Sequence, residues 1–369
     1  MNKIPFVDLR SMHEELRSEL LDDFNRVVFE SSNFIRGNED LKFEKQFAEY
    51  CDAKYCVGVG TGLDAIYLLL KAFGIKSGDE VIIPSNTYIA TALAVSYTGA
   101  IPVFVEPEIE TYNIDVSKIE EKITDKTKCI IPVHLQGRPA DLDPITEIAN
   151  RYNLHIIDDA AQAHGAKYKK RRIGSLCEAT AWSFYPGKNL GALGDAGCIT
   201  TNNKELAEKV KSLGDYGSDY KYHHIYKGTN SRLDELQAAF LSSKLKKLDI
   251  WNEERRRIAA KYLTGITNPL INLPLPVSED FEHVYHVFAI RCDHRDKLEQ
   301  YLFENNIVTL KHYPIPIHLQ GAYYDLNIHD GDLPIAEEIS RTVLSLPMYY
   351  GLRDEEIEYV IDSINSFSF

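Results

Sequence analysis

The sequence has no long apolar run, and its six cysteines lack the paired spacing of a metal site. No stretch approaches the roughly 20 apolar residues that span a bilayer, and the N-terminal MNKIPFVDLRSMHEEL lacks the apolar core of a secretory signal. The cysteines are scattered without CxxC or CxxH spacing, mostly in apolar segments. We therefore expect reduced thiols in a cytoplasmic protein with no metal site and no membrane partner.

Positive charge is also scarce, because 41 Lys and Arg residues face 55 Asp and Glu residues, for a formal net charge of −14. A general nucleic-acid binder would have a basic surface, so this balance argues against that class. A small anionic ligand is still compatible with the sequence, because a few local cations can reverse the field inside a cleft. At 369 residues, the chain is long enough for two domains or one large α/β unit.

Between residues 53 and 215, short β-branched runs alternate with segments of helical character. The runs are YCVGV, EVIIP, PVFVE, KCIIPVH, LHIIDDA, ATAWSF and GCITT. Near-continuous apolar strands separated by helices predict an α/β fold with a mostly parallel sheet that is covered on both faces. Ligands bind such sheets at the carboxyl ends of the strands, so we look there for a site.

The second half of the chain has a different pattern. Residues 232–263 show helical periodicity with charged outer positions and no breaker, which predicts one long helix that links two domains. Beyond it, apolar runs such as HVFAI alternate with helices such as RDKLEQYLFENN, which indicates a smaller α+β domain. We therefore expect a large domain over residues 1–245, N-terminal segment included, and a small domain over residues 246–369.

One lysine has an unusual setting. Lys188 lies in SFYPGKNLG, between a Pro-Gly approach and a glycine exit. Such a loop holds its backbone in turn conformations close to another group. An isolated Gly-Lys is more commonly a hairpin turn with a solvated lysine, so the interpretation depends on partners elsewhere in the chain.

A first partner is the strand-to-helix junction in GVGTGLDAIYLL, residues 58–69. Its small residues Gly60, Thr61 and Gly62 precede a helix, whose free backbone N–H groups and dipole suit a phosphate. The stretch matches neither GxGxxG nor the Walker pattern. A plain turn explains it almost as well.

A carboxylate and an aromatic ring are further partners. In LHIIDDAAQAHGA, an apolar strand ends in Asp158 and Asp159, one of which lies at the ligand edge of the sheet. A carboxylate there needs a cation or several donors, and a protonated pyridine nitrogen is such a cation. The alternative for either acid is a helix cap. Tyr88, in the loop after EVIIP, either stacks on a flat cofactor or belongs to the core.

A lysine, an acid, an anion site and a stacking ring are together what pyridoxal phosphate requires. With these residues, the sequence resembles the DegT-type sugar aminotransferases, which are nucleotide-sugar enzymes of the aspartate aminotransferase fold. The resemblance runs from IPFVDL at residue 4 to the C-terminal helix. Its most specific segments are SFYPGKNLGALGDAG, DDAAQAHGA, GTGLDA, GTNSRLDELQAA and HYPIPIHLQ.

The resemblance implies a large mixed-sheet cofactor domain, a small α+β C-terminal domain and an obligate homodimer. Lys188 stands at the position of the family's Schiff-base lysine. Some members carry a histidine at this position and act as dehydratases, so the lysine here favours amino transfer. The other cofactor contacts that the resemblance implies are Asp159 at the pyridine nitrogen, Gln162 at the ring hydroxyl, Tyr88 on the ring face, Gly60, Thr61 and Ser183 at the phosphate, and Asn230 at the phosphate from the other subunit.

The implied reaction moves an amino group from L-glutamate to a nucleotide-linked keto sugar. Our candidates for the sugar and its phosphates are Tyr185, Lys221, His312 and Tyr313. The segment HYPIPIHLQGAYYDL resembles family members that act on thymidine-diphosphate 3-keto-6-deoxyhexoses, which implies a 3-amino-3,6-dideoxyhexose product. Amination at the 4-position is the alternative.

Three other classes compete with this interpretation. The missing GxGxxG disfavours a dinucleotide-dependent oxidoreductase, and the histidines lack the ligand spacing of a metal enzyme. A non-catalytic sensor or scaffold is disfavoured by the intact Lys188, Asp159 and Ser183. We expect a structural role for His134, whereas Gln136 and Arg138 depart from the commoner family pattern near the substrate mouth.

Overall fold

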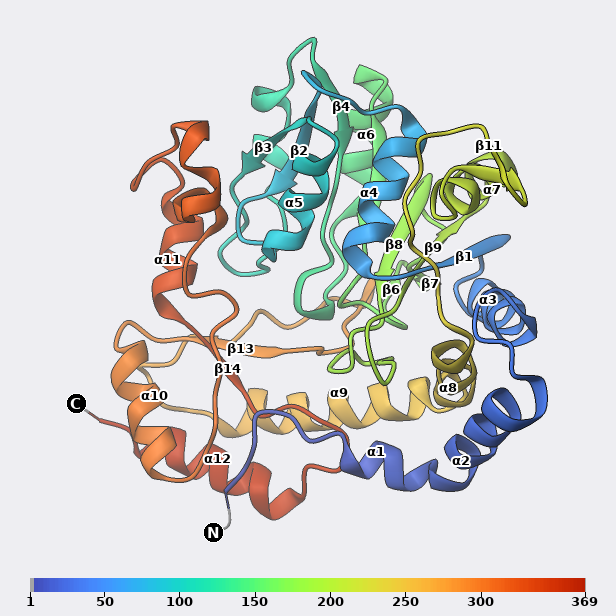
Figure 1. The fold of residues 1–369 in the computed structure, drawn as a ribbon. Helices are drawn as coiled ribbons and strands as arrows, with labels where there is room; N and C mark the ends of the chain where they lie inside the picture. The colour runs from blue at the N-terminus through green and yellow to red at the C-terminus, as the bar shows by residue number, and fades with distance from the viewer. Residues whose placement is uncertain (1–2, 369) are drawn as a thin grey trace.

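A seven-stranded sheet organises the computed structural model, which describes residues 3–368. Its strand order is β1-β9-β8-β5-β4-β2-β3, and β9 runs antiparallel to both of its neighbours while the other pairs are parallel (Figure 1). The sheet is thus mixed and mostly parallel, as the apolar runs predict. The strands are β1 Tyr55–Val59, β2 Glu80–Pro84, β3 Ile101–Val105, β4 Thr127–Ile130, β5 His155–Asp159, β8 Ala179–Ser183 and β9 Gly197–Thr201.

Helices cover both faces of the sheet. Alternate residues of β2 divide between two apolar cores, because Val81 and Ile83 pack in one core and Ile82 in the other. The first core contains side chains of α4 (Gly62–Phe73), α5 (Ile89–Tyr97) and α7 (Lys204–Leu213). The second contains side chains of α3 (Asn38–Tyr50), α6 (Leu142–Tyr152) and α8 (Glu235–Leu245).

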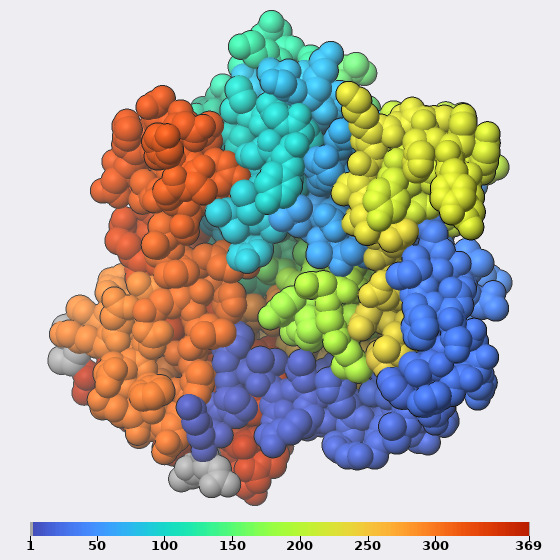
Figure 2. All heavy atoms as spheres, viewed as in Figure 1, coloured from blue at the N-terminus to red at the C-terminus, as the bar shows by residue number. Residues whose placement is uncertain are grey.

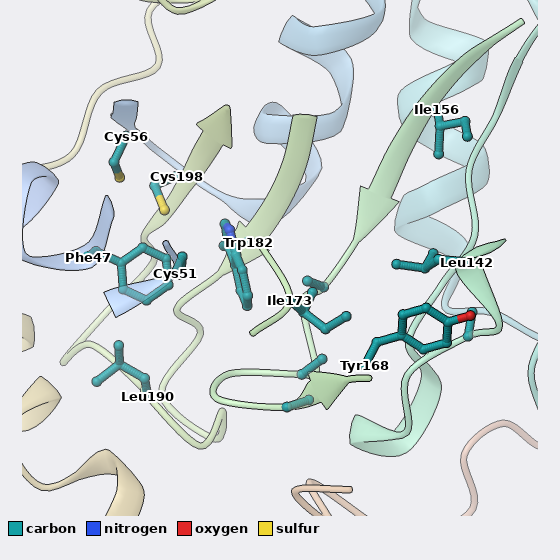
Figure 3. Packing of buried hydrophobic residues seen from close by; sticks show 14 of the residues in the cluster. Phe47, Cys51, Cys56, Leu142, Ile156, Tyr168, Ile173, Trp182, Leu190 and Cys198 are labelled. Atoms are coloured by element: carbon teal, nitrogen blue, oxygen red, sulfur yellow. The ribbon is translucent and has the colours of Figure 1, made fainter. Parts of the chain in front are cut away.

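Trp182 of β8 is a centre of the second core. It is fully buried, its ring lies 5.2 Å from that of Phe47, and its Nε1–H donates to Thr200 Oγ1 at 2.9 Å. Cys198 and Cys51 line the same region (Figure 3). All six cysteines are free thiols, and burial raises the pKa of Cys56.

The prediction of one long helix over residues 232–263 is wrong, because the structure has two helices there. α8 ends at Leu245, and α9 (Leu248–Gly265) begins after a turn at Lys246 and Lys247. The Lys247 N–H bonds to Lys244 O at 2.9 Å, which tightens the last turn of α8. The break has a packing reason: α8 is buried on nearly every side, whereas α9 buries one face and leaves the other to solvent.

The C-terminal part has its own apolar core, which combines α9, α10 (Arg295–Glu304) and α12 (Asp354–Ser366) with the antiparallel pair β13 (Phe288–Arg291) and β14 (Val343–Leu346). Ile4 lies in this core and pairs with Ile307. Residues 3–8 therefore pack against the C-terminal part. The division into residues 1–245 and 246–369 stays a prediction.

Shorter elements complete the chain. One of them, α11 (Pro334–Thr342), packs beside the large sheet, where Glu106 accepts hydrogen bonds from the N–H groups of Ile335 and Ala336. Within residues 3–368, no helix combines the length and apolar character needed to cross a membrane. The remaining elements are α1 Arg10–Glu15, α2 Arg17–Asn25, a π-helical turn Arg26–Ser31, α11 Pro334–Thr342, β6 Lys167–Tyr168, β7 Arg171–Arg172, β10 Ser218–Tyr220, β11 His223–His224, β12 Phe281–Glu282, and the 3-10 turns Val116–Lys118, Glu120–Lys122, Leu135–Gly137, Ile317–Leu319 and Gly321–Leu326.

Candidate active site

The candidate site lies at the carboxyl ends of the central strands. Asp159 and Ser183 are the last residues of the neighbouring parallel strands β5 and β8, and Thr61 is the N-cap of α4, which follows β1. Figure 2 shows a hollow in the centre of this face of the molecule, floored by green segments of the chain. This is the edge where the strand pattern predicts a ligand.

Lys188 lies in a turn that its neighbours make tight. Its N–H bonds to Tyr185 O at 2.8 Å, and a Cβ at Gly191 would come 2.2 Å from Pro186 O, so only glycine fits there. The Lys188 side chain is half-buried, and its amine donates no hydrogen bond to any residue of the described chain, 3–368. Burial lowers the pKa of this amine to about 8, while the charge of Asp159 acts in the opposite direction.

Of the two acids that end β5, Asp159 is the one on the side of Lys188. Its Oδ2 accepts from Thr91 Oγ1 at 2.8 Å, and its Oδ1 accepts from the N–H of Ala161 at 3.1 Å. Burial raises the pKa of Asp159, whereas these two hydrogen bonds and the charge of Lys188 act against that rise. Asp158 points to the other face, where it is fully buried 3.8 Å from His134 Nε2.

The start of α4 offers unpaired donors. Thr61 caps the helix by accepting the N–H of Asp64 at 3.0 Å, and the preceding N–H groups of the helix have no partner in residues 3–368. A Cβ at Gly62 would come 2.6 Å from Ser183 Cβ, so glycine lets the helix start approach the Ser183 hydroxyl. Gly60 differs, because its N–H donates to Ser231 Oγ at 2.9 Å. The roles of these residues toward a phosphate stay predictions.

The predicted residues Gln162, Tyr313 and Tyr88 lie close together at the site. Gln162 Oε1 accepts the N–H of Gln136 at 2.5 Å, and Gln162 Nε2 donates to Tyr313 OH at 3.3 Å. The rings of Tyr88 and Tyr313 are 5.3 Å apart, and 54% of Tyr88 is exposed. An open aromatic face and a fixed amide therefore stand on one wall of the site.

The predicted sugar contacts divide into two groups. His312 is close to Lys188, because that charge, after burial, lowers the pKa of His312 to about 4; its Nδ1 lies 2.9 Å from Ser345 Oγ. Tyr185 is in the Lys188 loop and exposed. Lys221, in the β10–β11 turn, and Asn230 are exposed beside α7, and no contact within residues 3–368 brings either to Lys188.

His286 is a site residue that sequence reasoning missed. Its Nδ1 lies 3.1 Å from Oδ1 of Asn189, the residue after Lys188. Burial first and the charge of Lys188 second lower the pKa of His286 well below its usual value. The only available signal was a histidine inside the apolar run HVYHVF, which is typical of a core position.

These residues fit a flat cofactor that carries a phosphate, a basic ring nitrogen and a carbonyl that an amine can attack. Lys188 is the amine, and Asp159 is a buried carboxylate. Among the residues that the structure describes, no cation contacts Asp159 and the first N–H groups of α4 have no partner. Pyridoxal phosphate has this combination of groups.

Comparison with known proteins agrees with that chemistry. Residues 15–365 match the model of the DegT/DnrJ/EryC1/StrS aminotransferase family. The chain belongs to this family. It is therefore an aminotransferase, and the resemblance and the fold class expected from the sequence are confirmed.

Individual members are similar over nearly their full length. The dTDP-3-amino-3,6-dideoxy-alpha-D-galactopyranose transaminase of Aneurinibacillus thermoaerophilus is 53% identical, covering 99% of this chain and 100% of its own. The dTDP-3-amino-3,4,6-trideoxy-alpha-D-glucose transaminase of Streptomyces venezuelae is 47% identical over 99% and 96%. Among solved structures, S. venezuelae DesV in complex with a ketimine intermediate has a TM-score of 0.97 at 48% identity, covering 99% and 98%. Bacillus subtilis NtdA with bound PMP has a TM-score of 0.90 at 34% identity, covering 99% and 85%.

Proposed function

We propose that this aminotransferase uses pyridoxal 5′-phosphate to move the amino group of L-glutamate to a dTDP-linked 3-keto-6-deoxyhexose. The product is a 3-amino-3,6-dideoxyhexose still attached to its nucleotide. The observation that carries the proposal is a half-buried Lys188 with a lowered pKa and no hydrogen-bond partner among residues 3–368, in a chain of this family. The 3-position is supported by the relatives of A. thermoaerophilus and S. venezuelae, both named for 3-amino sugars.

Each group of the cofactor has a residue to hold it. We assign the phosphate to the start of α4 and Ser183, the ring nitrogen to Asp159, the ring hydroxyl to Gln162 and the ring face to Tyr88. When bound, pyridoxal phosphate supplies an electron-poor ring that takes up the charge left when a proton leaves the amino-bearing carbon. The carboxylate of Asp159 favours the protonated ring nitrogen, because an opposite charge stabilises a buried cation.

Lys188 moves the proton in both half-reactions. An amine with a pKa of about 8 is present in both charged and neutral forms near neutral pH, so it can accept and return a proton. The tight turn at Gly191 limits where this amine can reach. Glutamate and the keto sugar use the same site in turn, so ping-pong kinetics follow.

The sugar nucleotide contacts Tyr185, Lys221, His312 and Tyr313 in this proposal. His312 has a pKa of about 4 and is therefore neutral at working pH, so it acts as a hydrogen-bond partner for a sugar hydroxyl. Lys221 supplies positive charge for the diphosphate. This local cation is needed because the whole chain is acidic.

We further propose that the enzyme is a cytoplasmic homodimer with shared active sites. The support is a set of exposed apolar side chains in the segment of α2 and α3. Figure 2 shows this blue segment next to the yellow segment that contains the β10–β11 hairpin, which carries Lys221. Burial of this surface would bring Lys221 and Asn230 to the partner's site. Its members in the N-terminal segment are Leu21, Phe24, Phe29, Phe34, Ile35 and Leu41.

The test is to supply the enzyme, pyridoxal phosphate and glutamate with 3-keto and 4-keto dTDP-6-deoxyhexoses, and to locate the new C–N bond by NMR. We expect nitrogen at carbon 3. Nitrogen only at carbon 4 would refute the proposed substrate, while the aminotransferase activity would stand.

A further inference from the structure

One buried side chain of α9 joins the two loops that carry the proposed chemistry. Asn252 Nδ2 donates to His164 O at 2.8 Å, and Asn252 Oδ1 accepts from Asn189 Nδ2 at 2.8 Å. His164 lies in the loop that follows Asp159, and Asn189 directly follows Lys188. We propose that Asn252 is a positioning residue that holds Lys188 in its place relative to Asp159, a role that rests on the proposed function.

The hydrogen bond between Asn252 and Asn189 is shielded from solvent. Asn252 and Asn189 are each only 1% exposed, so water cannot replace either partner of their hydrogen bond. A Cβ at Gly165 would come 2.6 Å from Asn252 Nδ2, so glycine is what lets the loop approach α9 this closely. Removing the Asn252 amide would leave a buried donor on Asn189 and a buried carbonyl on His164 without partners.

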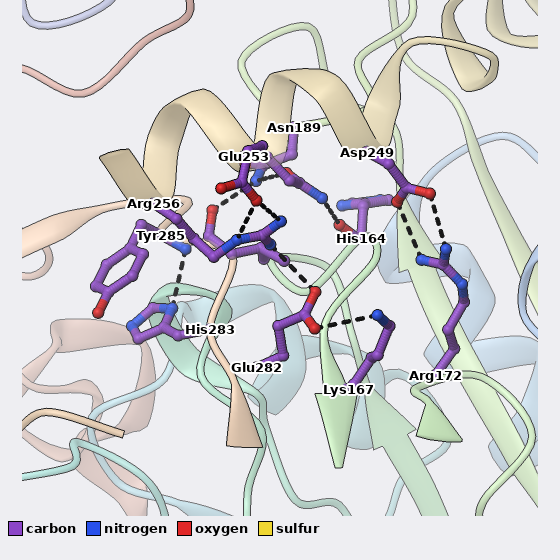
Figure 4. Close-up of polar contacts among 12 residues, drawn as sticks. His164, Lys167, Arg172, Asn189, Asp249, Glu253, Arg256, Glu282, His283 and Tyr285 are labelled. Atoms are coloured by element: carbon purple, nitrogen blue, oxygen red, sulfur yellow. Dashed lines mark hydrogen bonds and ion pairs between the residues drawn. The ribbon is translucent and has the colours of Figure 1, made fainter. Parts of the chain in front are cut away.

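Hydrogen bonds to Asn252 and Val284 fix the orientation of Asn189, which Figure 4 labels together with His164. Both amide protons of Asn189 are used, one by Asn252 and one by Val284 O at 3.0 Å. Its Oδ1 therefore faces His286 and can only accept, so His286 Nδ1 carries the proton. Asn252 thus also sets the tautomer of the imidazole near Lys188, and leaves on His286 Nε2 a lone pair that accepts from no group in the described part of the chain.

Asn252 acts through Asn189 and contacts no reacting group. Loss of the Asn252 side chain should therefore increase the mobility of the loop that carries Lys188. Because burial is the main cause of the lowered Lys188 pKa, a loosened loop exposes the amine and raises this pKa from about 8 toward its ordinary value of 10.5.

The first experiment measures that change without the cofactor. Lys188 in the apoprotein is acetylated with acetic anhydride over a pH series, and the extent is read from its peptide by mass spectrometry. The matched control for Asn252→Ala is Asn268→Ala, another buried asparagine, which donates to Ile364 O and Phe367 O at 2.8 Å in the C-terminal core. We expect a higher midpoint for Asn252→Ala and an unchanged midpoint for Asn268→Ala.

The second experiment is a double-mutant cycle in kcat with Asn189→Ala. Residues that act through one hydrogen bond give losses that do not multiply, so the double variant should be little slower than the slower single variant, with KM nearly constant. If Asn252→Ala does not fold, Asn252→Ser serves both experiments, because its shorter side chain also fails to reach Asn189.

Two results would overturn the proposal: a Lys188 midpoint that is the same in Asn252→Ala and wild type, or losses in kcat that multiply in the double variant. A failure of the proposed function looks different. In that case wild-type protein shows no transamination, while the labelling experiment on the apoprotein still reports on Asn252.

Discussion

At the scale of single residues, two hydrogen bonds place Asp159, and not its neighbour Asp158, at the candidate site. The loop around Lys188 and the acid pair at residues 158–159 are visible in the sequence, because a lysine between glycines and two acids directly after an apolar run stand out from their surroundings. Strand alternation alone could not decide which acid faces the site, and the hydrogen bonds of Asp159 with Thr91 and Ala161 decide it. His286 was out of reach, because a histidine in an apolar run looks like a core residue until its neighbour Asn189 is known.

The tautomer of His286 leads to a prediction with two matched variants. An asparagine side chain can replace the Nδ1–H donor of histidine, whereas a glutamine side chain extends toward the Nε2 position. Because Nδ1–H is the group that contacts Asn189 at 3.1 Å, His286→Asn should keep a larger fraction of wild-type kcat than His286→Gln. Steady-state kinetics on both variants check this. The reverse order would mean that the free Nε2 lone pair is the more important group.

At the scale of elements, the contact between α8 and the start of α3 brings the acids Glu235, Asp40 and Glu44 together. Glu235 of α8 accepts the N–H groups of Gly37, Glu39 and Asp40 at 2.6–3.0 Å, which holds the start of α3. Burial, followed by the charges of Glu44 and Glu235, raises the pKa of Asp40 to about 7. The sequence could not reveal this, because α8 and α3 are nearly 200 residues apart.

This cluster predicts that Asp40→Asn stabilises the protein. The folded-state pKa of Asp40 lies above its ordinary 3.8, so its stability contribution is present at low pH and is lost as the pH rises through about 7. The variant removes that loss and should raise the free energy of unfolding by about 1–3 kcal/mol at about pH 8, and by less at about pH 5. Urea unfolding at both pH values measures the difference.

The control for this measurement is Asp362→Asn on the exposed side of α12, where the change should have little effect at either pH. An Asp40→Asn gain that is equal at both pH values would contradict the assigned pKa.

At the scale of the whole molecule, the apolar runs predicted the sheet because a parallel sheet covered on both faces needs near-continuous apolar strands. The expected single helix over residues 232–263 failed because no local breaker marks Lys246 and Lys247; the change of direction is set by packing against other parts of the fold. In the proposed homodimer, Lys221 and Asn230 act at the site of the second chain, so their ligand contacts follow neither from the sequence nor from one protomer.

A mixing experiment tests that dependence on a second chain. Lys188→Ala and Asn230→Ala should each lower turnover as pure proteins. If Asn230 acts across the dimer, one site of each mixed dimer carries both changes and the other carries neither, so activity returns on mixing. The readout is turnover after co-expression of the two variants, with mixed dimers isolated by two different tags. Mixed dimers without recovered activity would show that Asn230 acts within its own chain.

The central claim, that Lys188 holds the cofactor covalently, has a direct measurement. Protein loaded with pyridoxal phosphate is reduced with borohydride, digested and examined by mass spectrometry. We predict that the peptide containing Lys188 gains the mass of the reduced cofactor, and that Lys188→Ala gains none. The informative competitor is Lys244, which burial also gives a pKa of about 8, but which already donates to Gly191 O at 2.7 Å. Label on Lys244 in place of Lys188, or no label at all, would contradict the account.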